Sequence, residues 1–572
     1  MTTGDRATAI GGESWRAGTG TPAGAGPRHG TRGSRVWPAR AAWAAGIVAV
    51  TAILFFCYCR QSGTVMTGSD GGSIALQAWD MLHGNVLLRH WTVSDVSFYP
   101  TELVQYALIE KVWGLGPEVV HIAGAMTYTL LILLAAWLAR GRATGREGLI
   151  RALVAVVVML APAPGAAPTL LMSPDHFGST VPVLLTWLAV ELLPPSRGGR
   201  VRWFGPAAVA ILLAWGQFAD GLILVTGVAP MVIVCGVRAG VKLWQRARGS
   251  GVPERRAPGT EALGGWPWAE VSLAAAALVS VGLARAAGAF IRLSGGFAVR
   301  AVPLSFAGRS VLPHNLKLTA EGLLALFGAD FTGPHSRLDL AFAALHLIVV
   351  AAAAVAFVLA LGRLGRDDEL VVPGLAIAIV LNIAAYVPTS LVQDLRSTRE
   401  ISAVLPFAAV LAGRLLAGPL LRARLTAVLA VAGAVCAAAL GYHAAQPPQP
   451  AQNQSLAAWL ASRHLSGGLA VNYWAANSTT LDSGARITVR QVGLLGGPGH
   501  GILVRPLPRE LKSDWYSPAS QYANFYVTSD TNPASASEQA AAVRTFGPPA
   551  QTLHPAGYTV LVWHKNLLAD IR

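Results

Sequence analysis

The stretch TGSDGGSIALQAWDMLHGNVLLRHWTVSDVSFYP, residues Thr67–Pro100, follows the first long apolar segment of the chain and is the first place where acidic residues stand beside one. Asp70 has Gly68 before it and Gly71–Gly72 after it, so the backbone can turn sharply and let another molecule approach the carboxylate. From Ile74 onward the apolar residues recur on one face, which predicts an amphipathic helix lying at a membrane surface. An ordinary turn and a packing helix are the plainer alternatives.

The composition is that of an integral membrane protein. Of 572 residues, 53% are apolar and only 13% are charged, so the chain lacks the polar coat of a soluble protein. The net charge of +15 comes from short basic clusters between apolar runs, a distribution that indicates membrane orientation and not nucleic-acid binding. The four cysteines lie in apolar segments without a CxxC pair, which argues against a disulfide framework and a Cys/His metal site.

Eleven apolar segments have spanning or nearly spanning length, although several are shorter than the roughly 20 residues that a bilayer core requires. They predict a polytopic α-helical membrane domain over residues 39–442, preceded by a disordered cytoplasmic tail over residues 1–38. The segments are Ala41–Tyr58, Val119–Leu138, Leu149–Pro164, Ser179–Leu193, Phe204–Phe218, Gly221–Val237, Trp268–Phe290, Leu338–Leu361, Leu370–Val387, Ile401–Leu416 and Leu425–Tyr442.

The basic residues predict the orientation. With the amino terminus inside, the cytoplasmic tail and loops hold more than half of the 44 Lys and Arg residues, as the positive-inside tendency requires. An odd number of spans then places the carboxyl terminus outside the cytoplasm. Several acidic residues at the ends of the spans fall on that outer side, among them Asp70, Asp175, Asp220 and Asp394. We therefore expect a multi-pass plasma-membrane protein whose polar chemistry faces outward.

The sequence changes character after Tyr442. HAAQPPQPAQNQ is a polar spacer, and the rest of residues 443–572 alternates strand and helix patterns, which predicts a small extracytoplasmic α/β domain. Aromatic residues such as Trp474 and Tyr522 could stack on sugar rings, but such residues more often fill a core. No acid–base group stands out here, so we expect this domain to leave the donor site to the loops of the membrane domain.

Two further outer elements carry candidate site residues. SPDHFGS, residues Ser173–Ser179, sets Asp175 and His176 between two spans; a helix cap for Asp175 is the alternative, and one residue can serve as both cap and site. DLRSTREISAVLPF places Arg396 and Arg399 just before a late span, on the side where arginines are disfavoured. Guanidinium groups are well suited to bind phosphate.

Two weaker candidates complete the outer face. Asp220, in Gln217–Asp220, can be explained as the end of a helix. The long connection from Arg292 to Arg337 contains Lys317 among glycines and prolines. Loops of this length are either working parts or disordered.

The arrangement of these elements resembles that of the GT-C glycosyltransferases. The resemblance covers the first span, the acid-bearing first outer loop, the acid between the third and fourth spans, RxxREISAVLPF and an outer carboxyl-terminal α/β domain. NYWAANSTT, residues Asn472–Thr480, is similar to the soluble ends of actinobacterial members. The chain departs from many members in having a single Asp70 where they carry an acidic pair, and it has no DxD motif. Metal dependence is therefore left open.

The resemblance implies transfer of a sugar from a polyprenyl-phosphate donor to an extracytoplasmic acceptor, with inversion. It assigns the catalytic base to Asp70, the lipid phosphate to Arg396, Arg399 and Lys317, and substrate orientation to Asp175, beside His176. Two other classes compete with this hypothesis: a transporter or channel, and a non-catalytic membrane scaffold whose outer domain binds cell-wall material. The donor sugar and acceptor are not specified by the sequence.

Overall fold

The computed structural model describes residues 36–193, 196–197, 200–201, 203–248, 267–300, 305–333, 336–364, 369–497 and 501–571. Contacts divide the chain into two units, Met1–Ala52 and Ile53–Arg572, and the arrangement below concerns the second unit. The predicted disordered tail lies outside the described residues, except for Val36–Pro38. These three residues already belong to the first helix, α1 (Val36–Ser62), so the tail prediction is wrong there.

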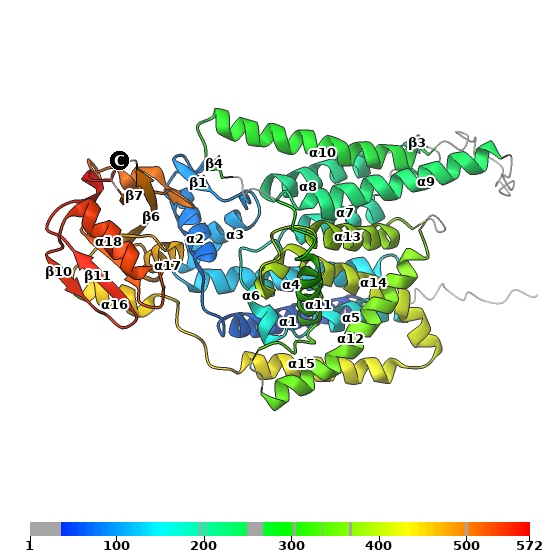
Figure 1. Ribbon diagram of the computed structural model, residues 1–572. Coiled ribbons are helices and arrows are strands. Elements are labelled where there is room, and N and C mark those ends of the chain that lie inside the picture. Colours follow the sequence, from blue (N-terminus) through cyan, green and yellow to red (C-terminus); the bar gives the residue numbers. More distant parts are fainter. Residues whose placement is uncertain are drawn as a thin grey trace, which may run out of the picture. The chain divides into compact units, whose positions relative to one another are not determined.

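The part of the second unit that precedes the spacer is helical (Figure 1). Every one of the eleven predicted apolar segments lies on a helix, because long apolar runs can satisfy their backbone groups only within helices in a membrane. Besides α1, these helices are α4 (Glu118–Arg140), α5 (Gly145–Met159), α7 (Thr180–Leu192), α8 (Phe204–Ala219), α9 (Ala229–Ala247) after the π-helical turn η2 (Leu224–Val228), α10 (Trp268–Leu293), α12 (Arg337–Leu361), α13 (Val371–Tyr386), α14 (Val404–Arg422) and α15 (Thr426–Ala444).

The number of membrane crossings is not confirmed at eleven. Within the described residues, seven helices are long and apolar enough to cross a membrane. An eighth span results if α5 is joined to η1 (Pro164–Ala166) and α6 (Ala167–Leu170), which follow it after a bend of 84°. The other three predicted segments form shorter apolar helices, α7, α8 and α13.

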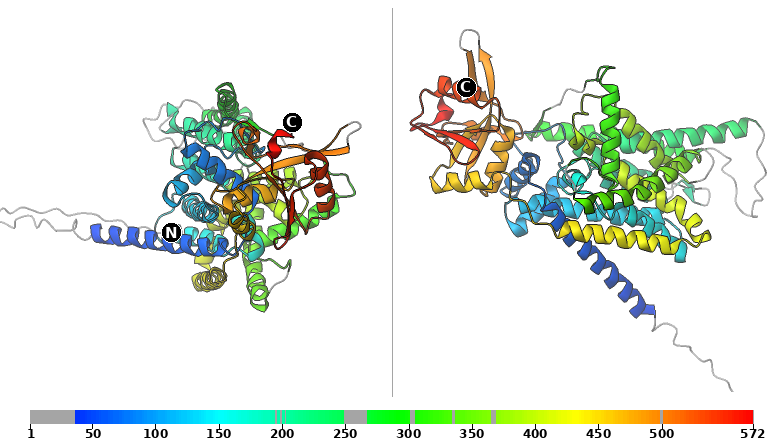
Figure 2. Two further views of the ribbon diagram at one scale, coloured as in Figure 1. Left: turned by 90° about the vertical axis from the view of Figure 1, so that its left-hand side faces the viewer. Right: turned by 60° about the horizontal axis from the view of Figure 1, so that its bottom comes forward.

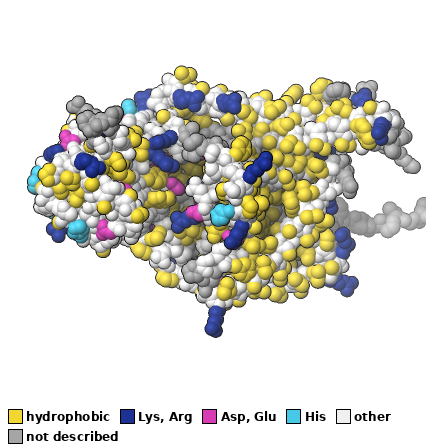
Figure 3. All heavy atoms as spheres, viewed as in Figure 1, with side chains coloured by type: hydrophobic (Ala, Val, Ile, Leu, Met, Phe, Trp, Pro, Cys, Tyr) yellow, Lys and Arg dark blue, Asp and Glu magenta, His cyan; other side chains and the backbone are white. Residues whose placement is uncertain are grey.

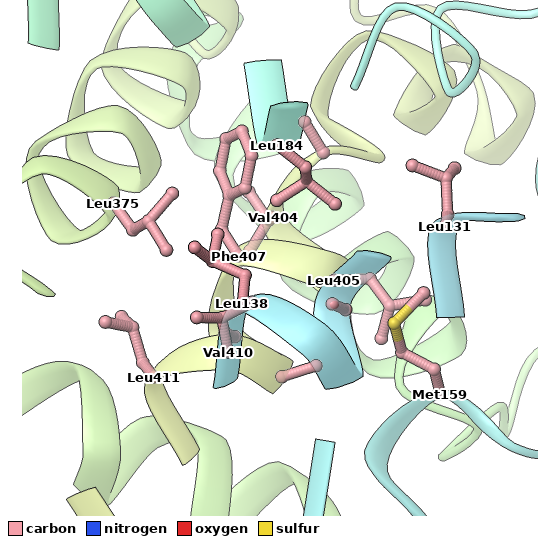
Figure 4. Packing of buried hydrophobic residues seen from close by; sticks show 14 of the residues in the cluster. Leu131, Leu138, Met159, Leu184, Leu375, Val404, Leu405, Phe407, Val410 and Leu411 are labelled. Atoms are coloured by element: carbon pink, nitrogen blue, oxygen red, sulfur yellow. The ribbon is translucent and has the colours of Figure 1, made fainter. Parts of the chain in front are cut away.

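The core of the helical region is built around α14. Figure 4 shows Val404, Leu405, Phe407, Val410 and Leu411 of this helix among leucines of the neighbouring helices α4, α7 and α13. These side chains are buried, and burying an aliphatic side chain stabilises a fold by about 1.5–3 kcal/mol. By contrast, hydrophobic side chains cover much of the outer surface of the same region in Figure 3, as contact with lipid requires.

Charged side chains meet at the two ends of the helical bundle. At one end, Arg414, which lies near the middle of α14, binds the backbone oxygen of Leu138 and the carboxylates of Glu191 and Glu369. Just before the amino-terminal end of α14 lies η3 (Leu395–Ile401), which carries Arg399. The residues predicted to lie on the inner side therefore meet at one end of the bundle. The residues predicted to lie on the outer side meet at the opposite end. Which end faces the cytoplasm stays a prediction.

Short elements assemble at the Arg399 end of the bundle. They are α2 (Ser69–Leu82), α3 (Glu102–Trp113) and α11 (Leu312–Leu326). The connection from Arg292 to Arg337 therefore contains a helix in its described part. A three-stranded sheet connects the loop after α2 to distant parts of the chain: β1 (Trp91–Val93) lies between β4 (Ala298–Val299) and β8 (Leu511–Lys512).

The region after the spacer forms the predicted α/β fold and lies at the α2 and α3 end of the bundle (Figures 1 and 2). Its six-stranded sheet has the order β10-β11-β9-β5-β6-β7, with β5 parallel to both β6 and β9. The strands are β5 (Gly467–Ala470), β6 (Thr488–Gly497), β7 (Gly501–Pro506), β9 (Phe525–Ser529), β10 (Gln551–Leu553) and β11 (Tyr558–Val562), and the helices are α16 (Gln454–Ser462), α17 (Tyr473–Asp482) and α18 (Ser535–Phe546). The smaller elements are β2 (Ser196–Arg197), β3 (Arg200–Val201), η4 (Ser513–Tyr516) and η5 (Leu567–Ala569).

Candidate active site

Asp70 lies in the first turn of α2, which begins at Ser69. The predicted sharp turn around this residue is therefore wrong, since Gly71 and Gly72 are helical. The helix is also not simply laid on a membrane surface, because nine of its fourteen residues are buried in the protein. Its neighbours are α3, α4 and α17. A carboxylate in the first turn of a helix is stabilised by the helix dipole.

The glycines around Asp70 serve close packing. A Cβ on Gly71 would lie 2.8 Å from Val120 Cγ1, and one on Gly68 would lie 2.9 Å from the ring of Trp474. A side chain at either position would therefore force its neighbours apart. The glycines bring α2 against α4 and α17, and Gly68 and Gly71 also line the first cavity beside Asp70, so their predicted role in admitting a substrate stays a prediction.

Arg399 joins three carboxylates from different segments. Its Nη1 lies 3.4 Å from Asp70 Oδ2 and 3.7 Å from Asp175 Oδ1, and its Nε lies 3.8 Å from Glu400 Oε1. These contacts are long for charge-assisted hydrogen bonds, which are about 2.7–2.9 Å. The Arg399 side chain is 43% exposed and that of Asp70 is 38% exposed. The guanidinium group is thus held in place yet remains open to a ligand.

His176 is clamped between two carboxylates. Its Nδ1 lies 2.7 Å from Asp220 Oδ2, and its Nε2 lies 3.1 Å from Glu400 Oε1. Burial opposes the positive charge on the imidazole, but the two carboxylates outweigh it and raise the pKa of His176 well above its ordinary value. Ser179 also donates to Asp220 Oδ2 at 2.5 Å. Protonated His176 therefore fixes Glu400, and through it the loop that carries Arg399.

Asp175 is a largely buried carboxyl of the cluster. Burial raises the pKa of Asp175 to about 8, although the neighbouring Arg399 acts in the opposite direction. Asp175 does not cap α7, whose N-cap residue is Ser179. The helix-end prediction for Asp220 is correct, since it is the C-cap residue of α8, but its carboxylate also binds His176.

The carboxyl-terminal region reaches into the same site. The Tyr473 hydroxyl, from the start of α17, lies 3.0 Å from Asp70 Oδ1 and also contacts a carboxylate oxygen of Glu510. Burial, together with the charge of Asp70, raises the pKa of Glu510 to about 7. The expectation that this region leaves the site to the membrane loops is therefore wrong. Asp70 is shared between the two parts of the chain.

Two cavities meet at this cluster. The first, of about 120 Å³, is walled largely by apolar side chains that include Val65, Met66, Pro168, Met172 and Trp474. The second, of about 300 Å³, is polar and is lined by Asp95, His176, Glu400, Arg509 and Glu510 among others. Asp70, Asp175 and Arg399 line both. These three ionisable side chains therefore form the boundary between an apolar and a polar space.

The two remaining sequence candidates have different locations. Arg396 lines the first cavity and is exposed. Lys317 lines neither cavity; its ammonium nitrogen lies 3.8 Å from Glu321 Oε1, one turn along α11, and the side chain is 72% exposed. Of the three predicted phosphate-binding cations, the structure brings Arg396 and Arg399 to the cluster and leaves Lys317 outside it.

Comparison with protein-family models gives no match, and comparison with curated proteins gives none either. Among solved structures, the chain is similar to ArnT from Cupriavidus metallidurans in the apo state, with 14% identity and a TM-score of 0.43 over 93% of this chain and 99% of that chain. It is likewise similar to the same protein bound to undecaprenyl phosphate, with 14% identity and a TM-score of 0.42 over 91% and 98%. Likeness at this level assigns no activity, so the chemistry must be argued from the residues of this chain.

Three site residues escape prediction from the sequence. Glu400 directly follows Arg399 within RxxREISAVLPF, in which only the arginines are predicted to bind phosphate. Glu510 and Tyr473 lie more than 400 residues from Asp70 in the sequence. The only sequence signal for Tyr473 is its place in NYWAANSTT, where it could equally fill a core. Within the described residues, no three His, Cys, Asp or Glu side chains are grouped so that they could hold a metal ion.

Proposed function

We propose that the protein is a membrane glycosyltransferase that moves a sugar from a polyprenyl-phosphate donor to an acceptor outside the cytoplasm. The observation that carries this proposal is the pairing of Asp70 with Arg399, 3.4 Å apart, at the boundary of an apolar and a polar cavity. Such a transfer needs a carboxylate for the acceptor proton and a cation for the departing phosphate. The resemblance of the sequence layout to the GT-C enzymes supports the same assignment.

The donor side of the reaction is the first cavity. Its apolar wall suits the beginning of a prenyl chain, and Arg396 and Arg399 would hold the phosphate at its polar edge. Guanidinium groups bind phosphate oxygens in pairs of parallel hydrogen bonds. Because Arg399 makes only long contacts with its carboxylates, phosphate oxygens can replace them without leaving a buried charge unpaired.

The acceptor side is the second cavity. There the acceptor hydroxyl would give its proton to Asp70 as its oxygen bonds to the anomeric carbon, while the bond from that carbon to the phosphate oxygen breaks and its electron pair leaves with the phosphate. Arg399 would stabilise the charge that develops on this oxygen. One displacement of this kind inverts the anomeric centre. Asp175, with a pKa of about 8, would be protonated at neutral pH and could donate to a sugar oxygen.

A transporter is less well supported by the same geometry. Along α14, the charged clusters around Arg399 and Arg414 are separated by buried apolar residues, among them Leu405, Phe407 and Leu411 (Figure 4). A polar pathway through the bundle would place polar groups between the clusters, as intramembrane charges do in transporters. The polar groups instead gather at the cavity boundary, where a transfer reaction would use them.

The test is to compare envelope glycans, by mass spectrometry, from cells that lack the protein and are complemented with the parent or with Asp70→Asn. We expect one sugar-bearing species to be lost without the protein, restored by the parent and not restored by a correctly inserted Asp70→Asn protein. Unchanged glycans in cells without the protein, together with no transfer by the purified protein from polyprenyl-phosphate sugars, would contradict the proposal.

A further inference from the structure

A third cavity lies between α8, α10 and the loop that carries Asp95 and Ser97. It has a volume of about 510 Å³, and most of its lining is apolar, including Phe218, Leu224 and Val281. The same helix α10 exposes large hydrophobic side chains, among them Leu283 and Phe290, as a helix in contact with lipid does. We call this cavity the α8–α10 groove.

Two arginines of α10 stand in this groove. Arg285, Gly288 and Arg292 occupy positions i, i+3 and i+7, so they lie on one face of the helix. The Cα atoms of the two arginines are about 10 Å apart along the axis at 1.5 Å per residue. Both side chains are exposed and neither makes an ion pair with any residue that the structure describes. Two unpaired charges beside hydrocarbon are costly and tend to mark function.

Gly288 shapes the groove between the two arginines. A Cβ placed on it would lie 3.6 Å from Arg292 Nη1 and 3.9 Å from Phe218 Cε2. The guanidinium group of Arg292 therefore folds back over the glycine, toward the turn that carries Arg285. A larger residue at position 288 would fill this space. The Arg292 guanidinium group is thus directed along the groove, which Arg285 also lines.

Asp95 connects the groove with the proposed acceptor side, because it lines both the groove and the second cavity. A molecule in the groove would consequently have its apolar part along α8 and α10, its anionic group between the two arginines, and its outermost part near Asp95. An amphiphile with a phosphate matches each of these requirements, since arginine binds phosphate well and the apolar wall accommodates a hydrocarbon chain.

We propose that the α8–α10 groove binds a membrane lipid with an anionic phosphate head group, held by Arg285 and Arg292. This lipid is distinct from the polyprenyl-phosphate donor, whose phosphate is assigned to Arg396 and Arg399 in another cavity. The groove does not depend on the proposed transfer reaction, because its charge, shape and apolar wall are properties of α8 and α10. Its occupant lies next to the cavity in which the proposed acceptor would react.

The test is native mass spectrometry of the full-length protein, titrated with phosphatidylglycerol and separately with phosphatidylcholine. Replacing both arginines, as Arg285→Gln with Arg292→Gln, should weaken phosphatidylglycerol binding at least about tenfold, because charge-assisted contacts are lost. Phosphatidylcholine retention should not change. Gly288→Leu keeps both charges but fills the groove, and it should also weaken phosphatidylglycerol binding. Arg337→Gln, at an exposed arginine that begins α12, should bind like the parent.

Several outcomes would overturn the proposal. These are parental phosphatidylglycerol binding by both the double variant and Gly288→Leu, an equal loss in Arg337→Gln, or loss of undecaprenyl-phosphate binding alone in the groove variants. The last would make the groove part of the donor site. Gly288→Leu decides the matter if the double variant does not fold. Lipid binding is measured without any sugar donor, so a protein that retains the groove pattern but transfers no sugar would contradict only the proposed function.

Discussion

The two charged clusters at the ends of the helical bundle both join an arginine to carboxylates, but one arginine is buried and the other is exposed. At one end, Arg414 is 5% exposed and its guanidinium group is saturated by Glu191, Glu369 and a backbone oxygen. At the other end, Arg399 is 43% exposed and lies 3.4–3.8 Å from its three carboxylates. We call the Arg414 cluster the closed cluster, because its contacts tie helices together and leave no room for a ligand. We call the Arg399 cluster the open cluster, because its long contacts allow a phosphate to replace a carboxylate.

The closed cluster is expected to contribute to stability and the open cluster to activity. Breaking the closed cluster should destabilise the fold and leave chemistry intact, whereas altering the open cluster should affect substrate and leave the fold intact. Arginine next to carboxylates is therefore not by itself a sign of an active site. The distinguishing features are the exposure of the pair, the length of its contacts and the cavities that it lines.

The largest effect is expected from Asp70→Asn. The substitution keeps the size of the side chain and removes the group that accepts the proton, so turnover should fall on the order of a hundredfold to ten-thousandfold with donor binding largely kept. Steady-state transfer by the purified protein measures this. Asp80→Asn is the control, since Asp80 pairs with Lys512 and lines neither cavity of the site. Near-parental turnover in Asp70→Asn would remove the residue from catalysis.

The closed cluster should show the converse behaviour. Arg414→Ala leaves two carboxylates without their partner, and breaking a buried ion pair in this way costs about 3–5 kcal/mol. The loss is measured as a lower melting temperature in detergent, while transfer per folded molecule stays the same. Arg422→Ala, at an exposed position on the same helix, is the matched control and should melt like the parent. Equal melting of both variants would mean that the closed cluster does not stabilise the bundle.

Asp175 makes the stability of the folded protein depend on pH. Its pKa of about 8 in the folded protein lies above the ordinary 3.8, so the native state holds a proton that the unfolded state releases between these values. Its contribution to stability therefore falls as the pH rises from about 4 to about 8, by on the order of 1 kcal/mol per pH unit. Melting temperatures at pH 5 and pH 8 should differ less for Asp175→Asn than for the parent. Parallel pH profiles for both proteins would rule out this titration.

The smallest effect is expected at the contact between the two parts of the chain. Tyr473→Phe removes a hydroxyl that bridges Asp70 and Glu510, and a hydrogen bond of this kind contributes about 1 kcal/mol. Turnover should fall a few-fold, with the melting temperature nearly unchanged. Tyr522→Phe, at an exposed tyrosine of the same region, serves as the control. A Tyr473→Phe protein as active as the parent would mean that the carboxyl-terminal region only covers the site.

The sequence predicts the local features of this molecule better than its long-range contacts. Apolar runs correctly predict the helices, and most strands after the spacer follow from their alternating patterns. Asp70, Asp175 and Arg399 could be selected because each stands at the same predicted end of a span. Lys317 satisfies that criterion equally well and still lies outside the cavities, since position along the chain does not give the direction of a side chain.

The contacts that complete the cluster are non-local. Tyr473 and Glu510 lie beside Asp70 because α17 packs on α2, and that packing depends on glycines whose sequence pattern suggested a turn. Close helix packing and a flexible turn use the same residue for different reasons, so the pattern alone could not decide between them. The pairing of His176 with both Asp220 and Glu400 likewise depends on three segments meeting at one end of the bundle.

The most direct test of the account is equilibrium binding of a polyprenyl phosphate to the purified protein, its Arg399→Gln and Arg396→Gln variants, and Lys317→Gln. If the open cluster holds the phosphate, each of the two arginine variants should bind roughly tenfold to a hundredfold more weakly, with an unchanged melting temperature, because a charge-assisted contact is lost. Lys317→Gln should bind like the parent. Parental binding by both arginine variants would contradict the account and place the phosphate elsewhere.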